Sequence, residues 1–178
     1  QFAIMGSIYY TAMTGKATPT VGIVSNGEED GKGNELVREA GDLLKASALN
    51  FIGNIEPSDF FEARSDVAVA DGFVGNILLK TAEATAKYLV GRIRTEIGSS
   101  VLSTIGGSLA RPALRRVADN LNPNKVGGVP LLGVNGIVII GHGSSTSEGV
   151  KNAIGQARKG VEFGIVDAIR TGIERGGR

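Results

Sequence analysis

The feature that most constrains this chain is the alternation of four short apolar, β-branched runs with stretches of helical periodicity. The runs occupy residues 20–25, 50–55, 66–70 and 136–140. Near-continuous apolar strands separated by helices are typical of a parallel sheet that is covered on both faces. The sequence therefore predicts an α/β fold, with a mostly parallel sheet flanked by helices.

Helices are predicted where apolar residues recur every three or four positions. The expected ranges are about 2–12, 34–46, 58–62, 73–97 and 147–173. Asn34 and Ser58 are residue types that cap helix N-termini, and they begin the second and third ranges. The chain itself opens on Gln1, inside an apolar stretch and without an initiator methionine. We therefore expect residues 1–178 to be the C-terminal part of a longer protein.

Composition excludes several classes of protein. Nineteen basic and 18 acidic residues give a net charge of +1, which offers no electrostatic footprint for nucleic acid. With no cysteine and a single histidine, His142, the chain cannot build a disulfide scaffold or a multi-histidine metal site, and we expect no metal and no cofactor. No apolar run reaches the ~18–20 residues that span a bilayer. We therefore expect a cytoplasmic protein, with peripheral membrane contact at most.

Glycine supplies 27 of the 178 residues and recurs at the ends of the apolar runs. Glycine turns allow the backbone to approach a ligand closely. In open parallel sheets, ligands bind beyond the carboxyl ends of the strands. We therefore expect four glycine turns to line one edge of a single sheet and to share a site.

The first turn, residues 26–34, joins a strand to a helix and suits a phosphate cradle, because backbone amides and a lysine converge at a helix N-terminus. Its candidate ligands are Gly31, Lys32, Gly33 and Asn34. The three acids at 28–30 oppose phosphate unless they pair with cations, and the spacing is not that of a Walker A loop. A cradle and a plain turn capped by Asn34 both stay open.

The turn after the fourth strand contains the only histidine. Its candidate residues are His142, Gly143, Ser144 and Ser145. The serines suit capping of the last helix, and their amides suit an oxyanion or a phosphate. His142 suits proton transfer, or it is simply a hydrogen-bonded residue at a strand end. No G-x-S-x-G elbow occurs, which argues against a Ser–His–acid triad.

Two further turns carry single polar candidates. Asp71 and Gly72 lead from the third strand into the long helix, with Asn76 one turn later. Asp71 suits a helix cap or a partner for a donor on the ligand. Asn135, before the fourth strand, is a neutral donor that suits a carbonyl oxygen. The alternative for the Asp71 turn is a capped helix packed tightly on the sheet.

Residues 91–128 break the strand–helix rhythm and predict a basic helical hairpin. Apolar residues recur every four positions, Gly106 and Gly107 are expected to interrupt the first helix, and Pro112 is expected in the first turn of the second. Five arginines carry the charge: Arg92, Arg94, Arg111, Arg115 and Arg116. The hairpin is either a dimerisation or packing element with solvated arginines or a surface that leans on anionic membrane.

Six motifs, taken in order, closely resemble the PlsX family, bacterial phosphate acyltransferases of fatty acid and phospholipid synthesis. The motifs are Asn26–Glu35, Asn50–Asn54, Asp71–Asn76, Leu131–Gly136, His142–Ser145 and Lys151–Ile154. The likeness extends from about Phe2 to Ile173. It implies transfer of an acyl group from acyl carrier protein to inorganic phosphate, a fold similar to isocitrate/isopropylmalate dehydrogenase, a homodimer and peripheral membrane contact. It also implies that a preceding half is absent.

Chemistry and position, rather than the resemblance, suggest individual roles. Lys32 and the amides after Gly33 or Gly143 suit phosphate. Asn76 or Asn135 suits the thioester oxygen, and His142 suits protonation of the leaving thiolate. The basic hairpin also suits docking of an acidic carrier protein.

Two other classes of function stay open. One is a phosphate- or nucleotide-binding module without catalysis. The other is a dehydrogenase of the same fold, which the missing G-x-G-x-x-G fingerprint disfavours.

Overall fold

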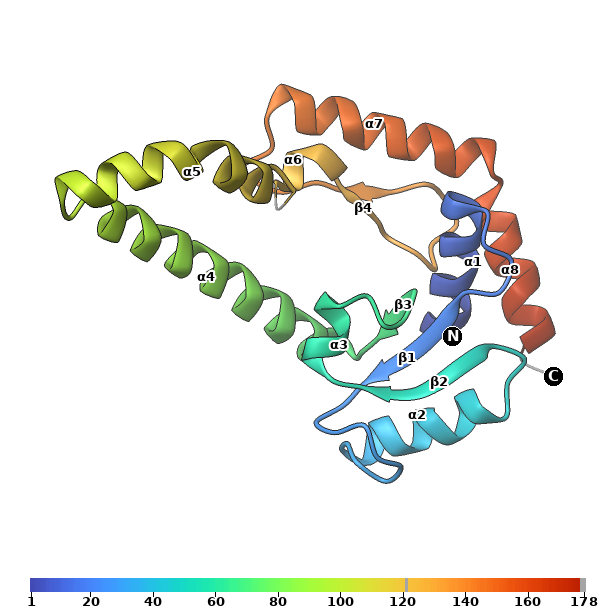
Figure 1. Ribbon diagram of the computed structural model, residues 1–178. Coiled ribbons are helices and arrows are strands. Elements are labelled where there is room, and N and C mark those ends of the chain that lie inside the picture. Colours follow the sequence, from blue (N-terminus) through green and yellow to red (C-terminus); the bar gives the residue numbers. More distant parts are fainter. Residues whose placement is uncertain (121, 177–178) are drawn as a thin grey trace.

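The computed structural model of the protein describes residues 1–120 and 122–176 (Figure 1). Its central sheet has three parallel strands in the order β2-β1-β3. The strands are β1 (Thr20–Val24), β2 (Asn50–Ile55) and β3 (Val67–Val69). Around them lie α1 (Phe2–Thr14), α2 (Glu35–Lys45), α3 (Pro57–Phe61), α4 (Gly72–Ile97), α5 (Val101–Asn120), α6 (Pro123–Val126), α7 (Ser147–Glu162) and α8 (Ile165–Gly176). The predicted α/β class and the parallel pairing of the first three runs are confirmed.

The fourth predicted strand does not join this sheet. Only Ile139–Ile140 form a strand, β5, which pairs antiparallel with β4 (Val129–Pro130) in a separate two-stranded sheet. The Leu131 N–H also donates to the Val138 carbonyl at 2.9 Å. The prediction of one four-stranded sheet is therefore wrong, because this run pairs with the segment that immediately precedes it in the chain.

Helix α1 contributes to both apolar cores. On one side Ala3 packs with Val21, Ile23 and Leu44, beneath β1 and α2. On the other side Met5 packs against α8, in a cluster that also contains two buried isoleucines of that helix. Figure 1 accordingly shows α1 between the sheet and α8. The apolar N-terminal helix thus links the two apolar cores of the chain.

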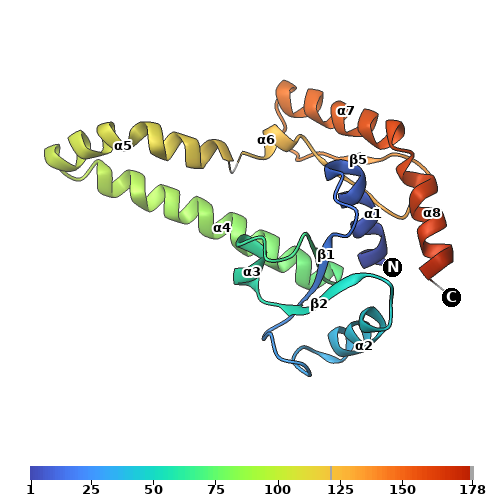
Figure 2. The same cartoon turned by 45° about the vertical axis from the view of Figure 1, so that its right-hand side comes forward.

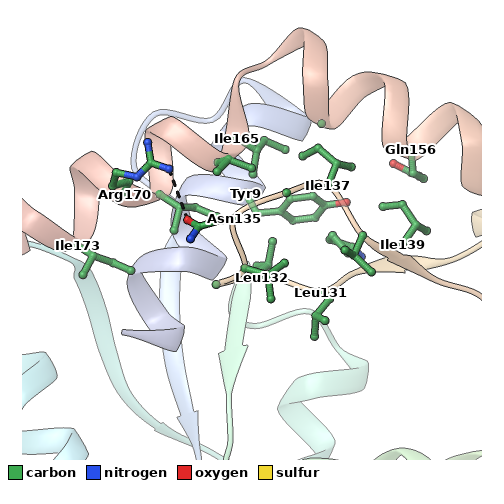
Figure 3. Close-up of a pocket in the computed structure, with 18 of the residues that line it drawn as sticks. Tyr9, Leu131, Leu132, Asn135, Ile137, Ile139, Gln156, Ile165, Arg170 and Ile173 are labelled. Atoms are coloured by element: carbon green, nitrogen blue, oxygen red, sulfur yellow. Dashed lines mark hydrogen bonds between the residues drawn. The ribbon is translucent and has the colours of Figure 1, made fainter.

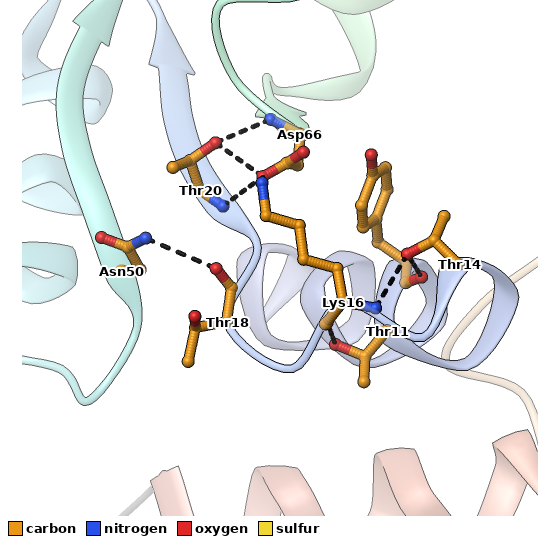
Figure 4. Close-up of polar contacts among 8 residues, drawn as sticks. Thr11, Thr14, Lys16, Thr18, Thr20, Asn50 and Asp66 are labelled. Atoms are coloured by element: carbon orange, nitrogen blue, oxygen red, sulfur yellow. Dashed lines mark hydrogen bonds and ion pairs between the residues drawn. The ribbon is translucent and has the colours of Figure 1, made fainter.

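The end of α1 is fastened to the start of the sheet by a polar cluster around Asp66 (Figure 4). Its Oδ2 accepts hydrogen bonds from Lys16 Nζ (2.6 Å), Thr20 N (2.7 Å) and Thr20 Oγ1 (2.8 Å), and the Asp66 N–H donates back to Thr20 Oγ1 at 2.9 Å. The Lys16 ammonium, followed by the Thr20 amide, holds the pKa of Asp66 well below its usual range. The cluster joins the first residue of β1 to the residue that precedes β3.

Helices α4 and α5 lie side by side, extending away from the sheet (Figures 1 and 2). The expected break at Gly106–Gly107 is wrong, because α5 runs through it, and Pro112 lies inside α5 rather than in a first turn. A methyl group at Gly107 would overlap the Ile97 side chain. Glycine there permits close approach of the two helices instead of ending one.

Two other helix boundaries differ from the prediction. The last helix is divided at Gly164, which has a φ of 58°, and α8 turns back onto α1. Helix α3 is capped by Glu56 rather than by Ser58, because Pro57 occupies the first helical position and Asp59 completes a capping box. Among the described residues, no helix has the length and apolarity needed to cross a membrane.

Candidate functional site

The carboxyl ends of β1 and β3 lie at the same edge of the central sheet, since the strands are parallel neighbours. The glycine-rich turn follows β1 and Asp71 follows β3. Beside the strand ends lies an apolar cavity of about 150 Å³, lined by Val24, Val37, Val69 and Asp71 among others. The predicted meeting of these two turns at one edge is confirmed.

The acids of the glycine-rich turn are paired with basic residues of the same chain. Glu28 forms an ion pair with Arg64, and Asp30 Oδ1 lies 2.8 Å from Lys45 Nζ. Arg64 also contacts Asp59 at 3.2 Å, and the Glu28 and Asp59 carboxylates raise the pKa of Arg64. Two of the three acids that would repel phosphate are therefore paired with basic residues from outside the loop.

The turn is closed by its own side chains. Asn26 Oδ1 accepts the Gly33 N–H at 2.9 Å, and Asn34 Oδ1 accepts the Val37 N–H at 2.9 Å as the N-cap of α2. These contacts fit the capped-turn interpretation and engage the Gly33 amide that a phosphate cradle would use. Lys32 and Gly31 line a separate cavity of about 140 Å³ beside α2.

Sequence reasoning missed Ser25 in this region. Its side chain is buried, and its Oγ has no hydrogen-bond partner among the described residues. A buried hydroxyl without a partner is energetically costly and marks a place where a water or ligand would bind. The apolar run that contains Ser25 does not predict an unpaired hydroxyl, because the burial of this hydroxyl depends on how the following loop folds.

Asp71 acts as the N-cap of α4. Its Oδ1 accepts the N–H groups of Phe73 and Val74, both at 2.9 Å. Gly72 and Asn76 occupy the first turns of α4, where both are exposed. Asp71 therefore caps a helix, as one of the two interpretations expected, and its carboxylate already accepts two hydrogen bonds.

The His142 turn is organised by Ser144. His142 Nδ1 lies 2.7 Å from Ser144 Oγ, and the Ser144 N–H donates to the same nitrogen at 3.2 Å. The predicted serine caps are wrong, because Thr146 caps α7 by accepting the Gly149 N–H. An open groove of about 400 Å³ passes His142 and Ser145. Gly143 is exposed at the tip of the turn.

Asn135 lines a third region, an apolar cavity of about 250 Å³ between α1, α7, α8 and residues 130–139 (Figure 3). Its Oδ1 lies 3.5 Å from an Arg170 guanidinium nitrogen, which faces it across the cavity rim. Sequence reasoning missed Arg170 and Tyr9 here, because both lie far along the chain from Asn135.

The four polar residues that define the predicted site do not share a cavity. Lys32, Asp71, Asn135 and His142 each line a different one. The prediction that all four turns lie along one edge is therefore wrong. The turns are separated because β5 pairs with β4 in a second sheet, so Asn135 and His142 do not lie at the edge of the central sheet.

The five predicted arginines all lie on α4 and α5 and are exposed: Arg92, Arg94, Arg111, Arg115 and Arg116. Arg92 pairs with Glu96 one turn later, at 2.9 Å. Within residues 1–120 and 122–176, no three His, Asp or Glu side chains gather closely enough to hold a metal ion.

Comparison with known proteins gives the chain a family. Curated relatives named Phosphate acyltransferase come from Pelotomaculum thermopropionicum (49% identical over 98% of the chain and 51% of the relative), Heliobacterium modesticaldum (47%, 96% and 51%) and Clostridium acetobutylicum (45%, 98% and 53%). The chain thus spans about half the length of these relatives. A family model described as "Fatty acid synthesis protein" matches residues 1–167. This match confirms the resemblance found in the motifs, and the chain belongs to the fatty acid synthesis protein family.

Proposed function

We propose that this chain forms part of a phosphate acyltransferase, which moves a fatty acyl group from acyl carrier protein to inorganic phosphate to give acyl phosphate for phospholipid synthesis. The observation that carries the proposal is the 43–49% identity to proteins named Phosphate acyltransferase along nearly the whole chain. We further propose that the chain is the C-terminal part of an isocitrate/isopropylmalate dehydrogenase-like enzyme, with residues 91–128 as a helical hairpin insertion.

The reaction needs positioning more than covalent catalysis. A phosphate oxygen attacks the thioester carbonyl, a tetrahedral oxyanion forms, and the carbon–sulfur bond breaks as the acyl phosphate leaves. The departing thiolate takes up a proton. The protein must hold phosphate beside the thioester and supply hydrogen-bond donors to the oxyanion.

The residues proposed for phosphate are Lys32 with the Gly31–Asn34 turn and the amides of the Gly143–Ser145 turn. Asp71, with Gly72, is proposed to accept a hydrogen bond from a donor on the substrate. Asn76 or Asn135 would donate to the thioester oxygen, and His142 would protonate the thiolate. Because Lys32, Asp71, Asn135 and His142 line separate cavities, the proposed site is composite. Its remaining walls would come from the other half of a full-length relative or from a second copy.

The α4–α5 pair is the proposed contact surface. Its apolar side chains are unusually exposed, with Val101, Leu102 and Leu109 each about four-fifths accessible. We propose that a second copy of the chain covers part of this face in a homodimer. The arginines of the pair would then meet an acidic carrier protein or an anionic membrane from the cytoplasmic side.

The test of the function is phosphate-dependent loss of the acyl group from acyl carrier protein. It should be run with this chain alone and with this chain joined to the unmatched half of the Pelotomaculum thermopropionicum relative. We expect acyl phosphate from the joined protein. Its Lys32→Ala and His142→Ala variants should each form acyl phosphate more slowly, by about 100-fold or more. Phosphate binding without turnover in the joined protein would instead indicate a non-catalytic phosphate- or nucleotide-binding module.

A further inference from the structure

We propose that the cavity between α1, α7, α8 and residues 130–139 binds the acyl chain, with Arg170 and Asn135 holding the polar head at its rim. The inference rests on the proposed function for the identity of the acyl ligand. Its location follows from the shape, lining and charge of this cavity.

The lining suits a flexible hydrocarbon. It is supplied mainly by aliphatic side chains, which Figure 3 shows on opposite walls: Leu131, Leu132, Ile137, Ile139, Ile165 and Ile173. Its volume of about 250 Å³ exceeds the ~150 Å³ of an engineered apolar cavity that stays dry and binds benzene. Since a methylene group is roughly as large as a water molecule, the space accommodates on the order of eight methylenes.

The rim supplies hydrogen-bond donors for a polar head. Arg170 donates to Asp167 at 2.8 Å through one terminal nitrogen and faces Asn135 Oδ1 at 3.5 Å through the other. A guanidinium has five N–H donors, so these two contacts leave others for a ligand. Asn135 uses its oxygen towards Arg170, which leaves its amide N–H groups for a carbonyl oxygen. A carboxylate, phosphate or thioester head therefore fits this end.

The opposite end is less apolar and limits the chain. The Tyr9 hydroxyl points toward Gln156, as Figure 3 shows, and burial raises the pKa of Tyr9. Gln156 Oε1 is buried and has no hydrogen-bond partner among the described residues. Because a terminal methyl group cannot satisfy these polar atoms, the chain is expected to stop short of them. Longer chains must leave the cavity by its open side.

The binding test uses the full chain and saturated carboxylates of four to fourteen carbons, titrated by calorimetry below their micelle concentrations. Affinity should rise about fourfold per methylene up to about eight carbons beyond the carboxylate, and then level off. An affinity that does not depend on chain length would overturn the proposal.

Two substitutions at Ile137 test the location. Ile137 lines the cavity and also rests against Gly160 of α7, where a methyl group would stand 3.1 Å from its Cδ1, so a larger side chain at this position is expected to intrude into the cavity. Ile137→Phe should weaken decanoate at least tenfold, and Ile137→Ala should move the plateau to longer chains, a gain that unfolding cannot imitate. Ile140→Phe, three residues along and outside the cavity lining, is the matched control. Equal effects at both positions would contradict the assignment.

Arg170→Gln tests the rim. It should weaken decanoate about tenfold or more and leave its methyl ester nearly unchanged, since the ester carries no charge. Equal loss for both probes would refute a role for Arg170 in holding the head.

Failure of the proposed function can be distinguished from failure of the cavity assignment. If only the function is wrong, carboxylates bind with this chain-length pattern while no acyl group passes to phosphate. Phosphate-dependent transfer whose chain-length preference ignores Ile137→Phe would overturn the cavity alone.

Discussion

His142 Nδ1 accepts a hydrogen bond from the Ser144 backbone N–H and lies 2.7 Å from Ser144 Oγ. A backbone N–H can only donate, so Nδ1 carries no proton in the neutral ring. The proton of the neutral ring must then reside on Nε2. In the proposed reaction this tautomer would offer a ready N–H donor to an oxyanion or a leaving thiolate.

We predict that ¹⁵N NMR of the neutral ring will show Nε2 protonated and Nδ1 unprotonated in the large majority of molecules. His142 is the only histidine, so its imidazole nitrogens can be assigned directly. Ser144→Ala keeps the backbone N–H but removes the hydroxyl, which lies close enough to donate to an unprotonated Nδ1. It should therefore raise the Nδ1-protonated population while Nε2 still dominates, whereas Ser145→Ala should change neither. A wild-type ring protonated mainly on Nδ1 would show that Ser144 does not set the tautomer.

The core of the parallel sheet makes a stability prediction. Ile55 is 1% exposed and fills the space over Gly22, where a side chain would begin 2.6 Å from its Cγ2. Ile55→Ala should lower the free energy of unfolding by about 2–5 kcal/mol, measured by urea denaturation. Ile52→Ala, on the same strand but 40% exposed, should cost less than half as much. Similar losses would mean that Ile55 is not a central core residue.

Much of the central sheet was predictable because its signals are local. The first three apolar runs, the Asn34 cap and the Asp71 cap lie within a few residues of the strands and helices they define. The fourth run carries the same apolar signal, but its pairing partner is not encoded in that signal. This run instead pairs antiparallel with β4, so it is not part of the predicted parallel sheet.

The helix pair shows the same limit. Gly106 and Gly107 have low helix propensity, which predicts a break. The structure uses Gly107 for contact with Ile97, ten residues earlier, and the helix continues. The rim of the acyl cavity was hidden for a similar reason, because Arg170 and Asn135 meet across 35 residues without any local motif. Tertiary contacts decided both cases.

The two last helices give a pair of glycine substitutions with opposite expected signs. Gly164 has a φ of 58°, which L-residues adopt with strain, so Gly164→Ala should destabilise the protein by about 1 kcal/mol. Gly155 lies within α7, and no other part of the described structure comes within 4 Å of a methyl group added there, the backbone of the helix itself aside. Gly155→Ala should therefore stabilise the protein by about 0.5–1 kcal/mol. Thermal unfolding of both variants checks this, and shifts of the same sign would contradict it.

The arginines of α5 allow a test of membrane contact. Reversing Arg111, Arg115 and Arg116 to glutamate should reduce binding to phosphatidylglycerol vesicles on the order of a hundredfold or more, since each basic residue near an anionic surface contributes about 1 kcal/mol. Flotation measures the bound fraction. Reversal of Lys151, Arg158 and Lys159 on α7 changes the net charge equally and is the control. If both triple variants lose binding to the same extent, net charge rather than the α4–α5 surface governs it.

Asp66 makes stability depend on pH in a defined direction. The pKa of its carboxyl is lowered by folding, so its contribution is fully present above the unfolded value of 3.8 and declines progressively as the pH falls from that value towards the lower pKa of the folded state. Asp59 acts in the same direction, because the Glu56 N–H and Arg64 lower its pKa. Asp66→Asn should be less stable than the parent protein at pH 7, with the difference narrowing at pH 3. Asp42→Asn, on the exposed surface of α2, is the control: its difference in stability from the parent protein should be the same at pH 7 and at pH 3. Urea midpoints at both pH values decide the matter, and a constant gap between Asp66→Asn and the parent would mean that the carboxylate does not fasten α1 to the sheet.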